Sequence, residues 1–263
     1  MKSSIRLFLS GARTSWITYF VEITPITFVG LRIPRMLLQT LFFVLLARAA
    51  GGSELARFAL IGNAIQIAVF NAMLSMVDIV DAEKWNNTFQ YLIAAPSNWL
   101  PIMLGKSISS YGEAIFSAVV SFAVLIPLLD IPIELINLLR AIPAALVIIA
   151  SASALGWLIG AIALPVRWGY AFGNWLAYLM IVLCGVNVPF SSLPIAVQWL
   201  GKFIPVTHGL LAVRAIVDGA TYSSTFSNLL IELAVCIVYA SFAWLVFGWR
   251  LKVTRQMGSI ELT

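Results

Sequence analysis

Hydrophobic and polar positions alternate with a helical period over the first 32 residues of the chain. One helical face carries the polar and basic residues Lys2, Arg6, Ser10 and Arg13. The opposite face consists of Ile5, Phe8, Leu9, Ala12, Trp16, Tyr19 and Phe20. A basic amphipathic helix of this kind lies in a membrane interface, and the alternative is a helix that packs on a soluble partner. A signal peptide is disfavoured because it needs one continuous apolar block.

Six long apolar stretches follow, and their hydropathy predicts transmembrane helices. The stretches end at residues that interrupt helices, such as the Gly51-Gly52 pair, Pro132 and Pro165. The predicted spans cover residues 33–50, 55–80, 107–129, 138–164, 171–188 and 225–249. The pattern therefore predicts an all-α membrane protein, with one domain over residues 1–263.

Composition supports this fold class. Of the 263 residues, 61% are hydrophobic and 10% are charged, whereas soluble globular proteins are about 45–50% apolar and about 25% charged. This excludes a soluble enzyme, a disordered protein and a free nucleic-acid-binding domain. Cys184 and Cys236 both lie inside apolar stretches, so the sequence indicates neither a disulfide framework nor a metal-ligand cluster.

The net charge of +5 is explained by membrane orientation, without a nucleic-acid partner. With both termini in the cytoplasm, eleven Lys and Arg residues fall on the cytoplasmic side and five on the outer side. The outer five are Arg48, Arg57, Arg140, Lys202 and Arg214. Since cytoplasmic loops are enriched in basic residues, we predict a multi-pass protein of the plasma (inner) membrane with both termini inside.

Two segments are neither plain spans nor plain loops. Residues 81–106 begin with Asp81 and Glu83, which suit a helix N-terminus, and carry apolar side chains at helical spacing until Pro96. These side chains are Trp85, Phe89, Leu92 and Ile93. We predict a short cytoplasmic helix that docks on lipid headgroups or on a protein, with a partnerless interfacial helix as the alternative.

The second segment, residues 186–222, is too apolar for a solvated loop and too interrupted by proline to span. It contains Pro189, Pro194 and Pro205. Irregular backbone at membrane depth must be buried in protein or line a wet cavity. We expect short helices at 195–203 and 208–217 that dip into the outer leaflet, acting either as a gate or as a cap.

These two segments, in this order, carry motifs that resemble a known family. In the first segment Glu83, Thr88, Leu92 and Pro96 match the family pattern, whereas Asn87 and Gln90 replace its glycine and second glutamate. In the second segment the match consists of Gly185, Pro189, Leu193-Pro194, Pro205 and Arg214. The chain thus resembles the permease subunit of type-2 ATP-binding-cassette (ABC-2) exporters over nearly its whole length.

The resemblance implies a division of labour between chains. Two copies of a separate ATPase subunit would bind ATP and Mg²⁺ and dock on a coupling helix, and two permease copies, most simply a homodimer, would form the pathway in the lipid membrane. The implied coupling residues are Glu83, Trp85, Thr88, Phe89, Leu92 and Pro96. The implied outer gate consists of Pro189, Leu193, Pro194, Pro205, His208 and Arg214. The sequence lacks a GxxxxGK[ST] phosphate loop, so we expect no cofactor in this chain.

Polar and aromatic residues inside the spans are candidates for a substrate pathway. Asn63, Gln66 and Phe70 share one helical face. Further candidates on the fifth span are Asn174, Trp175 and Tyr178. The alternatives are hydrogen bonds between helices for the amides and packing against a neighbouring helix for the aromatic rings.

Other titratable residues suggest supporting roles. Glu113 and Glu232 lie near the ends of their spans, where each is expected to reach interfacial water or a basic partner. His208 is the single histidine, and we expect it to form a hydrogen bond at the wet edge of the outer segment.

We therefore predict export of an amphiphilic substrate such as a drug, antibiotic, lipid or glycan-lipid. The rival functions are a stand-alone carrier or channel and an intramembrane lipid-modifying enzyme. The enzyme has little support, because the sequence places no Ser, His and Asp set and no pair of close carboxylates on a shared face.

Overall fold

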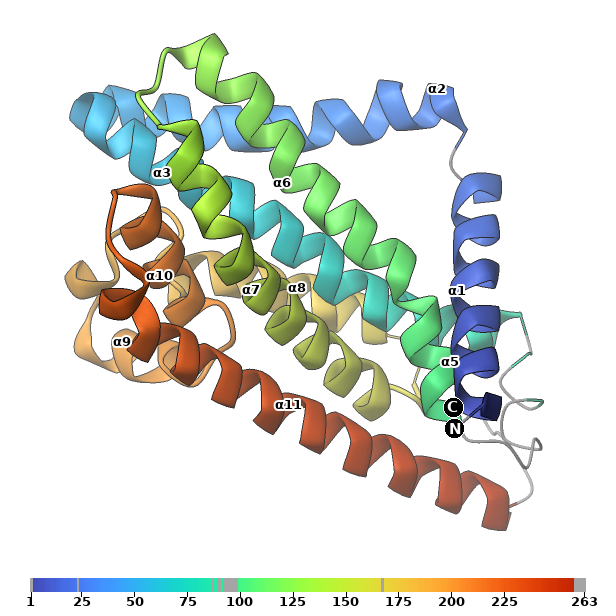
Figure 1. The fold of residues 1–263 in the computed structure, drawn as a ribbon. Helices are drawn as coiled ribbons and strands as arrows, with labels where there is room; N and C mark the ends of the chain where they lie inside the picture. The colour runs from blue at the N-terminus through green and yellow to red at the C-terminus, as the bar shows by residue number, and fades with distance from the viewer. Residues whose placement is uncertain are drawn as a thin grey trace.

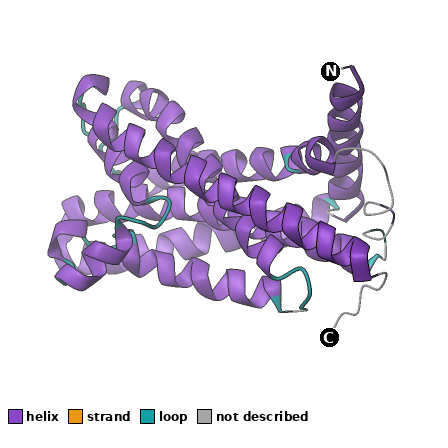
Figure 2. Ribbon diagram, turned by 90° about the horizontal axis from the view of Figure 1, so that it is seen from below, coloured by secondary structure: helices purple, strands orange, loops and turns teal. Residues whose placement is uncertain are grey.

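The computed structural model of the chain describes residues 2–22, 24–86, 88, 91, 99–166 and 168–257, and every regular element in them is a helix (Figures 1 and 2). The first helix, α1 (Lys2–Glu22), lies across one end of a bundle of longer helices (Figure 1). We call this the α1 end.

A change of direction separates α1 from the bundle. The short helix α2 (Pro25–Thr27) begins at Thr24, whose side-chain oxygen accepts a hydrogen bond of 3.2 Å from the Thr27 N–H. A proline in the first turn suits this start, because its missing N–H has no partner there. One π-helical turn, η1 (Phe28–Arg32), then leads into α3 (Ile33–Trp85).

Helix α3 folds back on itself at the Gly51-Gly52 pair. Gly51 and Gly52 have non-helical backbone angles, and the φ of +76° at Gly52 is one that residues with a side chain rarely adopt. Figure 1 shows the chain reversing direction at this point. The predicted spans 33–50 and 55–80 are thus the first and second arms of α3, and the pair ends the first arm as expected.

The second arm of α3 is the centre of the bundle. It packs against α6 (Ile108–Leu129), α7 (Leu135–Ile162) and α8 (Gly169–Leu183). Small residues allow this approach: a side chain at Gly156 of α7 would collide with the Met73 carbonyl. Helix α5 (Trp99–Lys106) precedes α6 and packs on α1, where Gly11 and Gly105 each meet backbone of the other helix.

The opposite end of the bundle, the α10 end, is formed by short helices. After α8 come η2 (Phe190–Ser192), α9 (Ile195–Gly201) and α10 (Thr207–Val217). The two short helices predicted after Pro194 are therefore confirmed, while their depth in a membrane stays a prediction. Helix α11 (Tyr222–Met257) then runs back along α7 to the α1 end (Figure 1).

Four helical segments of the described residues are long and apolar enough to cross a membrane. They are Pro25–Trp85, which contains both arms of α3, Trp99–Leu129, Leu135–Ile162 and Tyr222–Val253. The fifth predicted span corresponds to α8, which has 15 residues and is thus about 22 Å long. Because a hydrocarbon core is about 30 Å thick, helix length alone supports a membrane protein but does not establish six spans.

Candidate functional site

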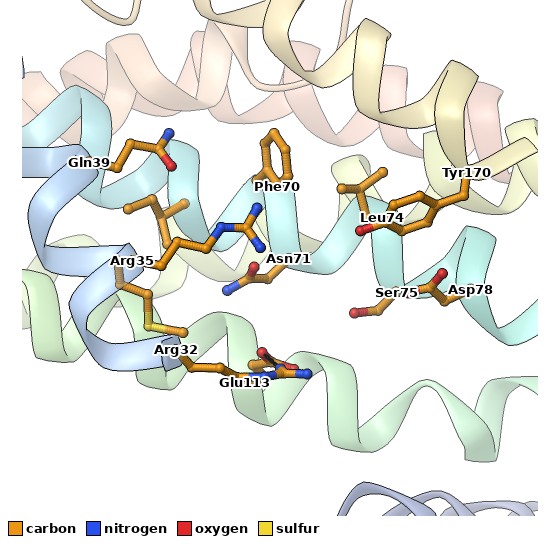
Figure 3. Close-up of a pocket in the computed structure, with 12 residues that line it drawn as sticks. Arg32, Arg35, Gln39, Phe70, Asn71, Leu74, Ser75, Asp78, Glu113 and Tyr170 are labelled. Atoms are coloured by element: carbon orange, nitrogen blue, oxygen red, sulfur yellow. Dashed lines mark hydrogen bonds and ion pairs between the residues drawn. The ribbon is translucent and has the colours of Figure 1, made fainter. Parts of the chain in front are cut away.

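A polar cavity of about 150 Å³ opens near the α1 end, between the two arms of α3, η1, α6 and the start of α8 (Figure 3). Hydrophobic side chains from α3 form part of its wall. The polar side chains that line it are Arg32, Arg35, Gln39, Asn71, Ser75, Asp78, Glu113 and Tyr170. Such a concentration of polar groups among apolar helices marks the cavity as the leading candidate for a binding site.

One charged pair of the cavity is internally neutralised. Arg32 of η1 forms an ion pair with Glu113 of α6, so the expected basic partner of Glu113 is confirmed. The Arg32 guanidinium also lies 5.7 Å from the centre of the Tyr19 ring. Burial raises the pKa of the Tyr19 hydroxyl, and Arg32 partly offsets this increase.

A second group in the cavity has no such partner. The Arg35 guanidinium lies 5.5 Å from the centre of the Phe70 ring, and none of the described carboxylates pairs with it. Figure 3 shows it between the Phe70 ring and the Asn71 amide. The Asn71 Nδ2 is buried without a hydrogen-bond partner in the described part of the chain. The sequence did not predict that Arg35 and Asn71 line a site. Arg35 entered only the count of basic residues that sets the membrane orientation, and Asn71 lies beside the helical face of Asn63, Gln66 and Phe70.

The predicted polar strip on α3 divides into two parts. Asn63 donates a 2.6 Å hydrogen bond to Asn187, and Gln66 donates a 3.2 Å bond to the Ala177 carbonyl. Both amides are buried between α3 and the segment that contains α8. Phe70 alone of the three lines the cavity, and its ring also meets the Tyr178 ring of α8 edge to face, with 5.4 Å between the ring centres. Whether the three residues serve a pathway stays a prediction.

The aromatic candidates of α8 face outward. Trp175 is 60% exposed and Tyr178 is 52% exposed, while Asn174 is partly exposed. Trp168 and Phe172 extend this outer face toward the α1 end, and Phe172 stacks on Trp175. In one copy of the chain these side chains therefore border the surrounding membrane or a neighbouring protein.

The predicted coupling segment begins later than expected. Helix α3 continues through Asp81 and Glu83 to Trp85, so the prediction that these acidic residues start a new helix is wrong. The extension of more than one turn beyond residue 80 is stabilised by polar contacts of Glu83 and Lys84 with neighbouring segments. Phe89, Leu92 and Pro96, with Asn87 and Gln90, lie outside the described residues.

Glu83 is a structural clamp at the end of α3. Its side chain is buried, and its carboxylate accepts hydrogen bonds from the Lys106 ammonium and, at 2.5 Å, from the Thr88 hydroxyl. Lys106 ends α5, so Glu83 joins the helices on both sides of the segment. Trp85 instead is 71% exposed.

Lys84 ties the same end of α3 to the end of α7. Its ammonium lies 2.5 Å from the Asp81 carboxylate and donates hydrogen bonds to the carbonyls of Ala163 and Val166 at 3.2 and 2.9 Å. A buried lysine requires partners of this kind. Together with Glu83 it makes the end of α3 a rigid junction of three helices.

At the α10 end, a buried carboxylate holds the start of α10. Glu232 of α11 is fully buried and accepts hydrogen bonds from Ser151 and from the N–H groups of Val206 and Gly209, at 2.7 and 2.9 Å for the two amides. The expectation that Glu232 reaches water or a basic partner is wrong. The unpaired N–H groups at a helix start are a natural site for a carboxylate.

Arg214 holds the other end of α10. It is buried, and it donates hydrogen bonds to the carbonyls of Gly185 and Val186 at 2.8 and 2.6 Å, with a longer bond of 3.4 Å to Phe58. Its guanidinium stacks on the Phe58 ring, 3.5 Å from the centre. Gly62 leaves room for it, because a side chain there would collide with Arg214.

The remaining predicted gate residues shape the connections around α9. Pro189 precedes η2, Leu193 and Pro194 precede α9, and Pro205 lies between α9 and α10. His208 is hydrogen-bonded to the Lys202 carbonyl at 3.3 Å in an exposed position, so its expected hydrogen bond at this edge is confirmed. Among the described residues, no group of three or more His, Cys, Asp or Glu could hold a metal ion.

Comparison with known proteins identifies the family. No curated protein matches the chain. The family model for the ABC-2 type transporter matches residues 7–217, which include most of α1, the polar cavity, the Glu83 clamp and α10. The chain therefore belongs to the ABC-2 type transporter family, as its permease or membrane domain.

Proposed function

We propose that this chain is the permease subunit of an ATP-driven exporter that moves an amphiphilic substrate out of the cell. Two copies of a separate ATPase subunit bind ATP and Mg²⁺ and power a homodimer of the permease. The complex lies in the plasma membrane, with both termini and the α1 end in the cytoplasm. The family supports a transport permease, and the location of the polar cavity supports loading from the α1 end.

The observation that carries the proposal is the Glu83 clamp. Through Lys106 and Thr88, one carboxylate joins the end of α3 to α5 and to the segment between them. A force on that segment is therefore transmitted to α3 as well as to α5. The cavity residues Phe70, Asn71 and Asp78 lie on the same arm of α3, one to four helical turns from Glu83.

ATP-driven closure of the ATPases would act through this junction. Helix α3 is rigid here because Lys84 also fixes it to the end of α7. Displacement of the second arm relative to the first arm changes the width of the cavity, since both arms line it. The proposed cycle loads substrate at the α1 end and releases it past α9.

A second copy of the chain completes the pathway. Trp175 and Tyr178 can line a route only if it runs between this chain and a neighbour, because they face outward from α8. The outward aromatic face of α8, formed by Trp168, Phe172, Trp175 and Tyr178, is the surface that we assign to the second copy. A homodimer with twofold symmetry would place the two faces together.

Co-purification with the ATPase tests the coupling role. The partner to search for is a phosphate-loop ATPase whose gene adjoins the gene of this chain. Trp85→Ala should strongly reduce complex formation, because Trp85 is exposed next to the Glu83 clamp. Trp199→Ala is the matched control, since Trp199 is 63% exposed on α9 at the opposite end. Equal yields of complex from both variants would contradict docking at this segment.

Export itself is tested with the reconstituted complex in liposomes. A panel of drugs, antibiotic peptides, lipids and lipid-linked glycans should include compounds that stimulate ATP hydrolysis and accumulate on the side away from the ATPases. Transport by the permease without the ATPase would instead support a stand-alone carrier or channel.

A further inference from the structure

The polar cavity contains hydrogen-bond donors that no described part of the chain satisfies. Among the described residues, the Arg35 guanidinium lies against the Phe70 ring and interacts electrostatically with Tyr170, but no described carboxylate pairs with it. The Asn71 Nδ2 is buried without a hydrogen bond. The Gln39 amide, on the turn of α3 after Arg35, also has no hydrogen bond to a described residue, and Figure 3 shows it facing the same space.

Of these donors, the buried Asn71 amide is costly to leave without an acceptor. A buried amide without a partner loses its hydration and gains nothing in return. Elsewhere on the same arm of α3, Asn63 and Gln66 each donate to a partner. The unpartnered Asn71 amide lies in the cavity wall, and the Arg35 guanidinium near it pairs with none of the described carboxylates. Together they point to an acceptor that arrives from outside the chain.

The charges of the cavity specify which kind of acceptor fits. Arg32 and Glu113 neutralise each other, and Asp78 lies beside Ser75 and Tyr170, away from Arg35 (Figure 3). The positive charge of Arg35 is therefore not neutralised within this part of the cavity, and the potential there is positive. A guanidinium and a nearby amide bind the oxygen atoms of a phosphate or carboxylate better than a neutral carbonyl.

The depth and the apolar wall indicate that this oxyanion belongs to an amphiphile. Arg35 is the third residue of α3, so it lies at the edge of the first arm, where a headgroup would reside. Met36, Ile67 and Leu74 form the apolar wall next to it. An oxyanion attached to a hydrocarbon chain would satisfy both surfaces.

We infer that Arg35, Gln39 and Asn71 form a binding site for the oxyanionic headgroup of an amphiphile, in which the phosphate or carboxylate accepts hydrogen bonds from Arg35 and Asn71. This site names the substrate class for the proposed exporter and so rests on that function. Its test uses the permease alone, so its failure can be distinguished from failure of the exporter proposal.

Ligand-induced stabilisation of the full chain tests the site. Thermal unfolding is measured in dodecyl maltoside with increasing amounts of dodecyl phosphate or dodecanoate, and separately with inorganic phosphate. Ligand that binds the native state raises the melting temperature in proportion to its affinity. At least one of the two dodecyl compounds should raise it, and inorganic phosphate should have little effect. The phosphate and carboxylate arms show which headgroup is preferred.

Substitutions then locate the effect. Arg35→Gln should weaken the apparent affinity about tenfold or more. Arg48→Gln is the matched control, because Arg48 lies on the same first arm but near the Gly51-Gly52 pair, where it donates a hydrogen bond to the Leu129 carbonyl. Equal loss of affinity in both variants, or no response to either dodecyl compound, would overturn the inference.

Asn71→Ala separates a binding role from a structural one. The variant should bind the dodecyl ligand several-fold more weakly, yet its melting temperature without ligand should equal or exceed that of the parent chain, because an unsatisfied buried amide is removed. A lower melting temperature without ligand would show that Asn71 supports the fold, and it would overturn the proposed role. A response to inorganic phosphate as strong as that to dodecyl phosphate would overturn the requirement for an amphiphile.

Discussion

The two ends of the bundle differ in how the polar side chains between their helices are partnered. At the α10 end, Glu232 and Arg214 form hydrogen bonds to backbone groups at the start of α10 and in the connection after α8, so the chain itself supplies their partners. At the α1 end, Arg35 and Asn71 lie in a cavity without such partners. The difference teaches that a polar or charged side chain near a helix end can either fix a helix or line a cavity open to a ligand, and its hydrogen-bond partners show which of the two it does.

This comparison gives the two ends different mechanical roles. Helix α10 is held at its start by Glu232 and near its end by Arg214, whereas the exposed helix α9 has no comparable hydrogen bonds to the long helices among the described residues. The strained backbone of Val206, with φ of +89°, lies between α9 and α10. In the proposed exporter α10 therefore acts as a fixed support, and rearrangement is confined to α9 and to the cavity end.

Removal of the Glu232 carboxylate should have the largest effect on stability. Glu232→Ala leaves the Ser151 hydroxyl and the N–H groups of Val206 and Gly209 without their acceptor, which should lower the free energy of unfolding by about 3 kcal/mol or more. Denaturation in mild detergent by a graded fraction of sodium dodecyl sulfate measures this change. The exposed carboxylate of Glu54 provides the control, since Glu54→Ala should have almost no effect.

Loss of the Arg214 guanidinium should have the next largest effect. Arg214→Gln withdraws the donors to the Gly185 and Val186 carbonyls, and it should reduce the free energy of unfolding by about 2 kcal/mol in the same assay. Hydrogen exchange should rise at the amides of α10. A variant with unchanged exchange there would show that α10 is held by apolar packing alone.

Two asparagines on the same helix sharpen the comparison further. Asn63→Ala removes a partnered amide and Asn71→Ala removes an unpartnered one, so helix propensity changes equally in both. The two variants should differ in unfolding free energy by about 1 kcal/mol, with Asn71→Ala the more stable. The reverse order would mean that Asn71 has a hidden structural partner.

The smallest expected stability change is at the Glu83 clamp. Lys106→Gln breaks a partly exposed ion pair and should cost about 1 kcal/mol or less. Its effect on function should be larger, because the ion pair joins α3 to α5 and would transmit force from the ATPase. Without it, the proposed complex should hydrolyse ATP but transport less substrate for each ATP. A parallel decrease in both rates would argue that the clamp serves only the fold.

The fold was predictable where a local pattern decides it. The apolar stretches, the Gly51-Gly52 interruption and the prolines around α9 are local signals, and each marks a helix or a break in the structure. The end of α3 was not predictable in the same way. Asp81 and Glu83 suit a helix N-terminus by charge, but α3 continues past them, where Lys84 forms hydrogen bonds to the residues that follow α7 and Glu83 pairs with Lys106 of α5.

The candidate site was predictable only in part, because partners depend on tertiary contacts. The candidate strip included Phe70, which lines the cavity, but nothing local distinguishes the hydrogen-bonded Asn63 from the unpartnered Asn71. Asn63 differs from Asn71 because Asn187, which follows α8, lies against it in the folded chain. Likewise, Glu232 meets α10 across more than twenty residues of sequence, so its role as a helix cap had no sequence signal.

Labelling at Ser75 tests the central claim most directly. The background is Cys184→Ala with Cys236→Ala, which removes both native thiols. In it, Ser75→Cys places one thiol in the cavity wall. Thr221→Cys is the control and places a thiol at an exposed position just before α11. In sealed membrane vesicles, a charged thiol reagent should modify the Ser75→Cys variant only from the side that carries the termini, and a dodecyl oxyanion that binds should protect it. Labelling from the other side, or an unchanged rate with a bound ligand, would contradict a substrate cavity loaded from the α1 end.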